Sequence, residues 1–335
     1  MSSLSNKTFY FKPLLKKEEA FPIRSKEAGV LIPEEYKSLL EWISRFQGGQ
    51  YPCLLEIDIL SFAGDHGIQK SLGKSTFRSG EFLLEAVKAD ALVQLFGPRQ
   101  GLGQIQQYWV DLGVDYQFES NLSYWLNHSN KLVNSKVRPR TESFTLYPAM
   151  TDMEMASAFH VGRKLIDRAH YHKRDLIVLH SLGDGQLYSV YNLAYALSAS
   201  NAQFWLDQFG KELFDPKTLL ELQKAAKRHP ISHDPFTNLC FYGGFEIVAL
   251  CGAMLRCAEQ GLPFLLSDPA SIIAWQYAEK IAPGISAYGY AIGSYASILE
   301  EGFNAIQEPL GNSLNGESWS PVLLKIFQAL SNIEH

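Results

Sequence analysis

The sequence predicts an α/β fold in which a parallel sheet is wrapped by helices. Short apolar runs alternate with longer segments whose apolar residues recur at helical spacing, a pattern typical of strands joined by crossover helices. One run, 175–180 (DLIVLH), is almost continuously apolar, as expected for a strand buried on both faces of a sheet. Such sheets bind ligands beyond the carboxyl ends of their strands, so we expect functional residues directly after Ala63, His180 and Ser267.

The first third of the chain is expected to contain two helices and two strands. Pro33 precedes the first helix, which carries Leu39, Leu40 and Ile43 on one face and is ended by the glycine pair 48–49. The expected elements are a helix over 36–46, a strand over 54–63, a helix over 78–96 and a strand over 108–112.

The rest of the chain continues this alternation. Thr151 and Glu154 have the spacing of a capping box, Pro216 stands at the start of one helix, and Gly261 directly follows another. The expected elements are helices over 151–170, 186–199, 216–228, 245–260 and 271–281, and strands over 175–180, 204–206 and 262–267. Segments 1–52 and 291–335 flank this core of 53–290, and we expect them to pack together as a second, smaller domain.

Composition excludes several classes of protein. The 335 residues carry a formal net charge of −5, so nothing indicates a nucleic-acid partner. No apolar run approaches the roughly 20 residues that a membrane helix needs, and the first residues lack an apolar signal core. The four cysteines form no C-x-x-C pair, which favours reduced thiols in a cytoplasmic protein. The nine histidines show no H-E-x-x-H spacing, so we expect neither a metal site nor a cofactor.

Two glycine-containing turns directly follow predicted strands. The turn Gly64-Asp65-His66-Gly67 offers an acid–base pair or metal ligands, but a tight turn with a helix-capping Asp and a hydrogen-bonding His is the favoured interpretation. The turn 181–185 (SLGDG) can direct backbone N–H groups and a helix N-terminus at a phosphate. Asp184 counts against a phosphate there, and a plain strand-to-helix turn is an equally good interpretation.

Two further segments place an acid beside glycine. Gly243 and Gly244 precede a helix and allow a close backbone approach, with Glu246 in the first turn; simple helix packing is the alternative. Glu317 lies in Asn315-Gly316-Glu317-Ser318, where an accessible carboxylate can act as a general base, although most loop glutamates are merely solvated.

The order and spacing of these segments resemble the family of nicotinate-nucleotide–dimethylbenzimidazole phosphoribosyltransferases. That family has the motifs F-A-A-D-H-G-V, G-V-S-x-Y-P, V-D-x-G-V, P-A-M-T, G-G-F-E-I and R-L-G-E-G. The similar segments here, in the same order, are 61–68 (SFAGDHGI), 73–77 (GKSTF), 110–114 (VDLGV), 147–151 (YPAMT), 243–247 (GGFEI) and 315–317 (NGE).

The resemblance implies a Rossmann-like large domain, a small helical domain from both chain ends, and a homodimer. It implies transfer of the phosphoribosyl group of nicotinate mononucleotide to 5,6-dimethylbenzimidazole or a related base, giving α-ribazole 5′-phosphate and nicotinate for the lower ligand of cobalamin. The family's general base maps onto Glu317, and its base pocket includes the serine mapped to Ser75. Its phosphate loop maps onto 181–186, with Lys217 or Lys224 as the accompanying lysine. The substrate-binding residues implied are Asp65, His66, Ser75, Ser181, Leu182, Gly183, Gly185, Lys217, Gly243, Gly244 and Glu246.

The chemistry of this transfer suits a carboxylate. An azole nitrogen is a poor nucleophile until its proton leaves, and a glutamate within hydrogen-bond reach removes that proton as nitrogen attacks C1′. The ribosyl centre passes through an oxocarbenium-like state, and attack opposite the departing nicotinate inverts it. No metal is needed, because nicotinate leaves from a pyridinium that is already cationic.

The phosphate loop departs from the family pattern. Where the family reads G-E-M-G-I-G-N-T-T, residues 180–188 read HSLGDGQLY. The alternative to an active transferase is therefore a divergent, non-catalytic paralogue that binds a nucleotide or base, and a minor alternative is a different glycosyl transfer or hydrolysis that uses Glu317.

Overall fold

A seven-stranded parallel sheet forms the centre of the computed structural model, which confirms the predicted α/β class. The structure describes residues 4–5, 7–14, 34–48, 56–73, 77–89, 104–117, 131–197, 214–266, 268–292 and 313–314. The strands are β1 (Glu56–Gly64), β2 (Gln104–Gly113), β3 (Leu132–Asn134), β4 (Leu176–Leu182), β5 (Phe264–Leu266), β6 (Gly289–Ile292) and β7 (Ser313–Leu314).

The sheet has the strand order β3-β2-β1-β4-β5-β6-β7. Strands β2 and β3 lie on one side of β1, in that order. Strands β4, β5, β6 and β7 follow one another on the other side of β1. The order therefore reverses between β1 and β4, whose residues pair from Ile57↔Leu176 to Ala63↔Leu182. In doubly wound sheets the crevice beyond the carboxyl ends at this switch point is where ligands bind.

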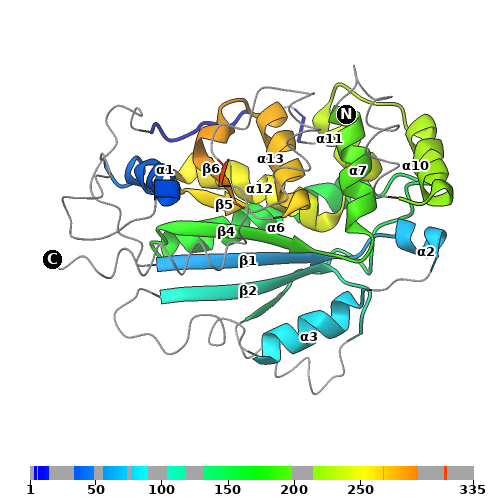
Figure 1. Ribbon diagram of the computed structural model, residues 1–335, viewed down its shortest axis with the longest axis horizontal. Coiled ribbons are helices and arrows are strands. Elements are labelled where there is room, and N and C mark those ends of the chain that lie inside the picture. Colours follow the sequence, from blue (N-terminus) through cyan, green and yellow to red (C-terminus); the bar gives the residue numbers. More distant parts are fainter. Residues whose placement is uncertain are drawn as a thin grey trace.

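Helices cover both faces of the sheet. In Figure 1, α3 lies on one side, and α7, α12 and α13 lie on the other. The described helices are α1 (Glu34–Ser44), α2 (Ile68–Leu72), α3 (Ser79–Ala89), α6 (Asp152–Tyr171), α7 (Gln186–Leu197), α10 (Pro216–Arg228), α11 (Pro235–Tyr242), α12 (Phe245–Gln260) and α13 (Pro269–Ile281), with a 3₁₀ turn η3 (Ile285–Tyr288).

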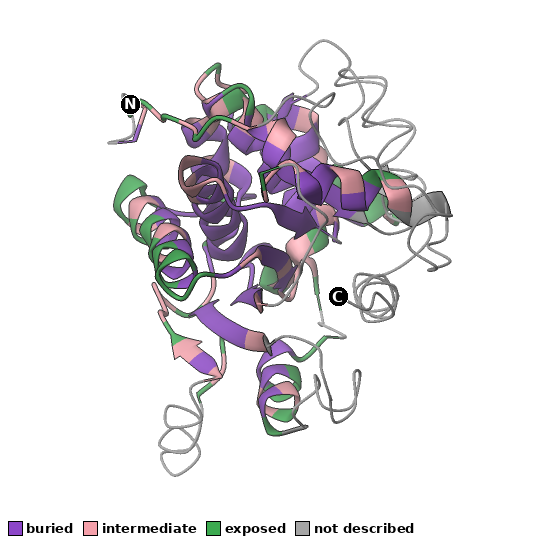
Figure 2. Ribbon diagram, turned by 90° about the vertical axis from the view of Figure 1, so that its left-hand side faces the viewer, coloured by how far each residue is buried: buried purple, intermediate pink, exposed green. Residues whose placement is uncertain are grey.

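Alternate residues of the central strands enter two different cores. Leu60 and Phe62 of β1 belong to the large cluster with α6 and α12, whereas Ala63 belongs to a smaller cluster with Leu83 of α3 and Trp109 of β2. This is the consequence of side chains alternating between the two faces of a strand. Figure 2 shows the buried residues concentrated where these helices meet the sheet.

Most predicted elements are confirmed within the described residues, with changed ends. Strand β2 begins at Gln104 rather than at Tyr108, because its first residues are amide-rich and lack the apolar signal. Helix α13 begins at Pro269, since Asp268 caps it and Pro at the first position suits a helix start. Helix α11, capped by Asp234, was not predicted. The expected strand over 204–206 lies outside the described residues.

The proposed division into two domains stays a prediction. Helix α1 of the N-terminal segment packs against residues 287–290, which belong to the expected large domain. Trp42 Nε1 donates to the Ala287 carbonyl at 2.9 Å, and Ser38 Oγ lies 2.9 Å from the Tyr290 hydroxyl. Residues 315–335 lie outside the described part of the chain. Among the helices that the structure describes, none is both long and apolar enough to cross a bilayer.

Candidate active site

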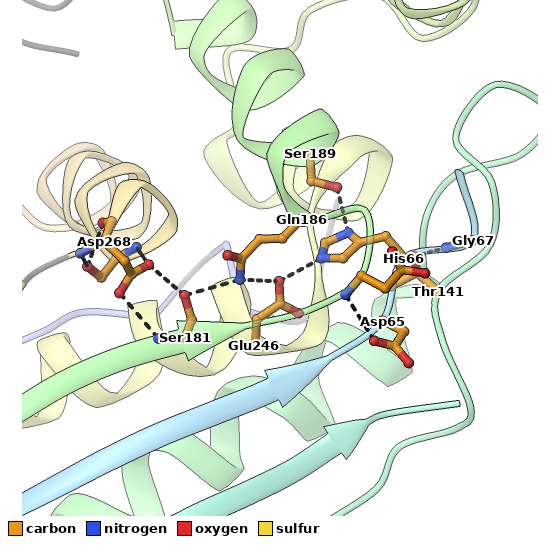
Figure 3. Close-up of polar contacts among 11 residues, drawn as sticks. Asp65, His66, Gly67, Thr141, Ser181, Gln186, Ser189, Glu246 and Asp268 are labelled. Atoms are coloured by element: carbon orange, nitrogen blue, oxygen red, sulfur yellow. Dashed lines mark hydrogen bonds and ion pairs between the residues drawn. The ribbon is translucent and has the colours of Figure 1, made fainter. Parts of the chain in front are cut away.

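The carboxyl ends of β1, β4 and β5 meet at the switch point, as the sequence predicts. Strand β4 extends to Leu182, so Ser181 and Leu182, which were expected in the turn, are its last two residues instead. Residues 65–67 follow β1, residues 183–185 follow β4, and Asp268 lies two residues beyond β5. The N-terminus of α12 reaches the same place, and the polar side chains of these segments form one connected set (Figure 3). This edge is the candidate active site.

Asp65 joins the three loops at this edge. Its Oδ2 accepts from the Asp115 amide at 2.7 Å, and its Oδ1 accepts from the Asp184 amide at 3.0 Å. The side chain is 4% exposed, so both carboxylate oxygens are occupied by backbone of the loops after β2 and β4. Arg140 pairs with Asp115 and lowers the pKa of that carboxyl, although burial acts in the opposite direction. Asp65 therefore holds the loops in place and does not face the crevice as a free acid.

His66 and Glu246 form a fully buried pair. His66 Nε2 lies 2.7 Å from Glu246 Oε1, and both side chains are 0% exposed. The other ring nitrogen, Nδ1, lies 2.7 Å from Ser189 Oγ in the first turns of α7. The imidazole is thus held at both nitrogens, which fixes its orientation between β1, α7 and α12.

Glu246 occupies the first turn of α12, where the partial positive charge of the helix N-terminus favours a carboxylate. Gly244 caps this helix, and a Cβ there would lie 2.4 Å from Glu246 Oε1, Glu246 Oε2 and His66 Cε1. A side chain at position 244 would therefore collide with both members of the pair. Glu246 Oε2 is buried without a hydrogen-bond partner among the described residues, an exceptional state for a carboxylate oxygen.

A chain of hydrogen bonds extends from this pair to β5. Gln186 Nε2 donates to Glu246 Oε1 at 3.3 Å and to Ser181 Oγ at 3.1 Å. Ser181 Oγ donates to Asp268 Oδ1 at 2.7 Å, and the Ser181 amide donates to Asp268 Oδ2 at 3.2 Å. Asp268 also caps α13, so the chain connects the first turns of three helices (Figure 3).

The loop after β4 is held close against the end of β1. Gly185 has a φ of +82°, a left-handed conformation that favours glycine, and it leads directly into α7. Leu182 is 7% exposed and packs in the small core cluster with Ala63 and Trp109, so only its backbone faces the loop. Gly183 lies against the Gly64 carbonyl. The loop thus delivers the N-terminus of α7 to the crevice.

Asp184 lies at the tip of this loop and is partly exposed. Its amide donates to Asp65 and its carbonyl accepts from the His66 amide at 2.9 Å. Burial raises the pKa of the Tyr188 hydroxyl, and the Asp184 carboxylate raises it further. The negative charge of Asp184 therefore acts on a residue in the first turn of α7.

The two candidate lysines lie on α10. Lys217 is exposed in the first turn, and Lys224 pairs with Glu221 at 2.7 Å. Lys217 is thus the candidate whose ammonium group is not already in an ion pair among the described residues. Gly243, at the end of α11, joins that helix to α12. Ser75 and Glu317 lie outside the described residues.

The sequence did not single out three polar residues that bond within this edge of the sheet: Ser189, Thr141 and Asp268. Ser189 gives no local signal, because a serine three residues into a helix is indistinguishable from a solvated one. Thr141, whose Oγ1 accepts from the Gly67 amide at 3.2 Å, lies in a loop with no motif of its own. Asp268 stands directly after Ser267, where the sequence predicts functional residues, although the residue itself was not singled out. Within the described ranges, no cluster of three or more His, Cys, Asp or Glu has the arrangement of a metal site.

Comparison with known proteins yields one consistent match. A family described as phosphoribosyltransferase matches residues 35–312. A protein of Pseudomonas putida (strain W619) named nicotinate-nucleotide–dimethylbenzimidazole phosphoribosyltransferase is 28% identical over 279 residues, covering 79% of this chain and 73% of that protein. A protein of the same name from Aromatoleum aromaticum is 27% identical over 243 residues, covering 71% of this chain and 67% of that protein.

The fold is also similar to a solved structure. The crystal structure of CobT from Thermus thermophilus superposes with a TM-score of 0.65 at 21% identity, covering 90% of this chain and 89% of that one. At this identity the likeness concerns the fold, and it extends over nearly the full length of both chains.

Proposed function

This chain belongs to the phosphoribosyltransferase family that it matches over residues 35–312, and on that premise we propose its reaction. The reaction is transfer of the phosphoribosyl group of nicotinate mononucleotide to 5,6-dimethylbenzimidazole or a related base. The products are α-ribazole 5′-phosphate and nicotinate, and the product nucleotide supplies the lower ligand of cobalamin. The relatives' names and the family membership support this assignment.

One structural observation links the proposed reaction to residues of this chain. The loop 183–185 brings the N-terminus of α7 to the switch point, beside the buried pair of His66 and Glu246. A helix N-terminus in this position attracts a phosphate through its dipole. We assign the phosphate of the nucleotide to this loop, with Lys217 as the accompanying cation.

Catalysis is assigned to Glu317. Its carboxylate takes the proton of the acceptor azole as the azole nitrogen attacks C1′ and the bond to nicotinate breaks, so the anomeric centre inverts. Ser75 is assigned to the base pocket. His66 and Glu246, which the resemblance placed among the substrate-binding residues, are 0% exposed, so we assign them to hold the loops that contact substrate.

The cell compartment, the domains and the assembly are part of the same proposal. We assign the protein to the cytoplasm, with a large domain over 53–290, a small helical domain from 1–52 and 291–335, and a two-fold homodimer. Light scattering at micromolar concentration should report about twice the chain mass of 37.7 kDa. A species of one chain mass would remove the dimer from the proposal.

The deciding assay measures nicotinate release from nicotinate mononucleotide with and without dimethylbenzimidazole. Release that depends on the base supports the transferase. Release without any base would indicate hydrolysis instead. If no nicotinate is released while nucleotide or base still binds, the divergent non-catalytic paralogue is the correct interpretation, a possibility that Asp184 in the phosphate loop keeps open.

A further inference from the structure

A second concave site lies at the opposite edge of the sheet from the switch point. The cavity has a volume of about 460 Å³ and opens where β1 and β2 begin and α6 ends. These strand starts are the left-hand ends in Figure 1, and the arrowheads mark the other edge. Strand β1 has nine residues, so the two edges lie roughly 25–30 Å apart. The cavity is lined by Glu56, Gln106, Tyr108, Arg168, His172, Lys173 and Arg174.

The end of α6 places three cations around this cavity. The Lys173 amide donates to the His170 carbonyl and the Arg174 amide to the Ala169 carbonyl, which is the hydrogen-bond pattern of a Schellman turn. Lys173 takes the left-handed position of that turn with a φ of +54°. Glycine is the residue that usually occupies this position, since a side chain costs conformational energy there. The turn presents Lys173 at the rim and directs Arg174 inward.

Arg174 is neutralised by the strand beneath it. Its Nε lies 2.7 Å from Asp58 Oδ1, and its Nη1 pairs with Glu56 Oε2. Arg174 is 7% exposed and Asp58 is 2% exposed, so the pair is buried in the cavity wall. The two carboxylates carry one negative charge more than Arg174, and Arg168 also acts on Asp58. Together with Arg168 and Lys173, these five groups therefore leave a net charge of +1.

Arg168 is held in a fixed orientation. Its guanidinium carbon lies 4.4 Å from the centroid of the Tyr108 ring, and Nη2 donates to the Tyr108 hydroxyl at 3.2 Å. That hydroxyl donates in turn to Gln106 Oε1. Among the described residues, the hydroxyl is the only hydrogen-bond partner of this guanidinium, and the ammonium group of Lys173 has none. Both cations therefore keep N–H groups that can donate to a ligand.

We propose that this cavity binds a small hydrophilic phosphate ester, with the phosphate between Arg168 and Lys173. A planar guanidinium fixed by stacking and an adjacent ammonium are the groups that recognise phosphate oxygens. The volume exceeds that of a phosphate ion, and the amide of Gln106, the imidazole of His172 and the carboxylate of Glu56 suit hydroxyl groups on the remainder of the ligand.

Two considerations separate this site from an ordinary basic helix end. Cations at a helix C-terminus are favoured by the helix dipole alone, but that requires neither a cavity nor a stacked arginine. The chain as a whole carries a net charge of −5, so the cationic lining is a local feature. The partial negative charge of the helix end, about half an elementary charge, is smaller than the net charge of +1 that Arg168, Lys173 and Arg174 leave after pairing with Glu56 and Asp58.

Calorimetric titration of the full-length chain with ribose 5-phosphate tests the proposal. We expect binding that weakens as salt rises, and that weakens about tenfold or more in Arg168→Gln and in Lys173→Gln, as for loss of a charged hydrogen bond. Lys164→Gln is the matched control, because Lys164 is exposed on the same helix but does not line the cavity. Circular dichroism verifies that each variant is folded.

Four results would overturn it. Unchanged affinity in Arg168→Gln and Lys173→Gln would remove both cations from the site. Equal weakening in Lys164→Gln would reduce the effect to general charge. Absence of binding to the wild type at millimolar ribose 5-phosphate would exclude the ligand class. The variant Lys217→Gln tests for binding at the switch-point edge. Binding of ribose 5-phosphate that is lost in Lys217→Gln and unchanged in Arg168→Gln would also contradict binding in the cavity. The inference does not rest on the proposed transferase, and we expect Arg168→Gln to release nicotinate at the wild-type rate.

Discussion

Glu246 Oε1 lies 2.7 Å from His66 Nε2, and neither side chain is exposed. The two residues are far apart in the chain and come from the end of β1 and the start of α12. Their contact joins the loop after β1 to the helix that fills the centre of the large core. We expect the integrity of the candidate active site to depend on it.

Replacing Glu246 tests this contact. Glu246→Ala leaves His66 Nε2 buried and unpaired, and it should lower the free energy of unfolding by about 3 kcal/mol, as for breaking a buried pair. Glu246→Gln keeps an acceptor for the imidazole and should cost about 1 kcal/mol. Chemical denaturation measures both. The control is Glu81→Ala in the first turn of α3, whose exposed pair with Arg78 should contribute less than about 1 kcal/mol. Equal losses at Glu246 and Glu81 would contradict the prediction.

Replacing Gly244 tests the space that the pair needs. The Cβ of Gly244→Ala would lie 2.4 Å from the Glu246 carboxylate and from His66 Cε1. We expect a loss of about 1–3 kcal/mol in the free energy of unfolding, typical of overpacking. Because the methyl group and the carboxylate compete for one space, the loss in the double variant with Glu246→Ala should be smaller than the sum of the single losses. Additive losses would show that the two groups do not compete.

Asp184→Asn tests the charge in the phosphate loop. A carboxylate about 4 Å from a phosphate in partly desolvated surroundings costs about 4 kcal/mol by Coulomb's law. We therefore expect weak binding of nicotinate mononucleotide to the wild type and tighter binding to the variant, with a gain that shrinks as salt rises. The backbone bonds of Asp184 to Asp65 and His66 do not involve its side chain and should survive.

Calorimetric titration of both proteins decides this prediction, with dimethylbenzimidazole as the control ligand because it carries no phosphate. Tight nucleotide binding by the wild type that is unchanged in Asp184→Asn would place Asp184 outside the nucleotide site. If neither protein binds nucleotide while both bind the base, the transferase assignment is wrong and the divergent non-catalytic paralogue is the correct interpretation.

Glu317→Gln tests the assignment of the general base. Loss of a general base should reduce turnover by about 10² to 10⁴-fold while nucleotide binding is retained. Initial rates of nicotinate release with dimethylbenzimidazole present, measured alongside calorimetric binding of nicotinate mononucleotide, separate the two effects. Unchanged turnover would remove Glu317 from the mechanism.

His229 should make stability depend on pH. Its ring is buried, with Nε2 2.9 Å from the Phe144 carbonyl, and burial lowers its pKa, assisted by Arg228 and opposed by that carbonyl. The unfolded chain binds a proton near the ordinary value of about 6.5, whereas the folded chain does so only at lower pH. The free energy of unfolding should therefore fall as pH drops below about 6.5. Denaturation between pH 8 and pH 5 should show a shallower fall in His229→Gln; an identical slope would be the contrary result.

The strands and helices could be predicted because their signals are local. The continuous apolar run of β4 and the capping box of α6 lie within a few neighbouring residues, and both predictions are confirmed. Helix α11 was missed because its eight residues are too few to show a clear period, and β3 and β6 have only three and four residues. Such short strands form only because the sheet supplies their partners.

The sequence by itself determined the fold class, the glycine-rich turns and the edge of the sheet where they meet. Periodicity and strand ends are properties of neighbouring residues, and parallel strands necessarily share one carboxyl edge. Only the tertiary structure decided what each polar side chain does there. Asp65 uses both oxygens to accept from backbone amides, and His66 meets Glu246 across a sequence separation of 180 residues. Hydrogen-bond partners are chosen by distance in space and by the need to satisfy buried groups, and neither is encoded in the residues next to them.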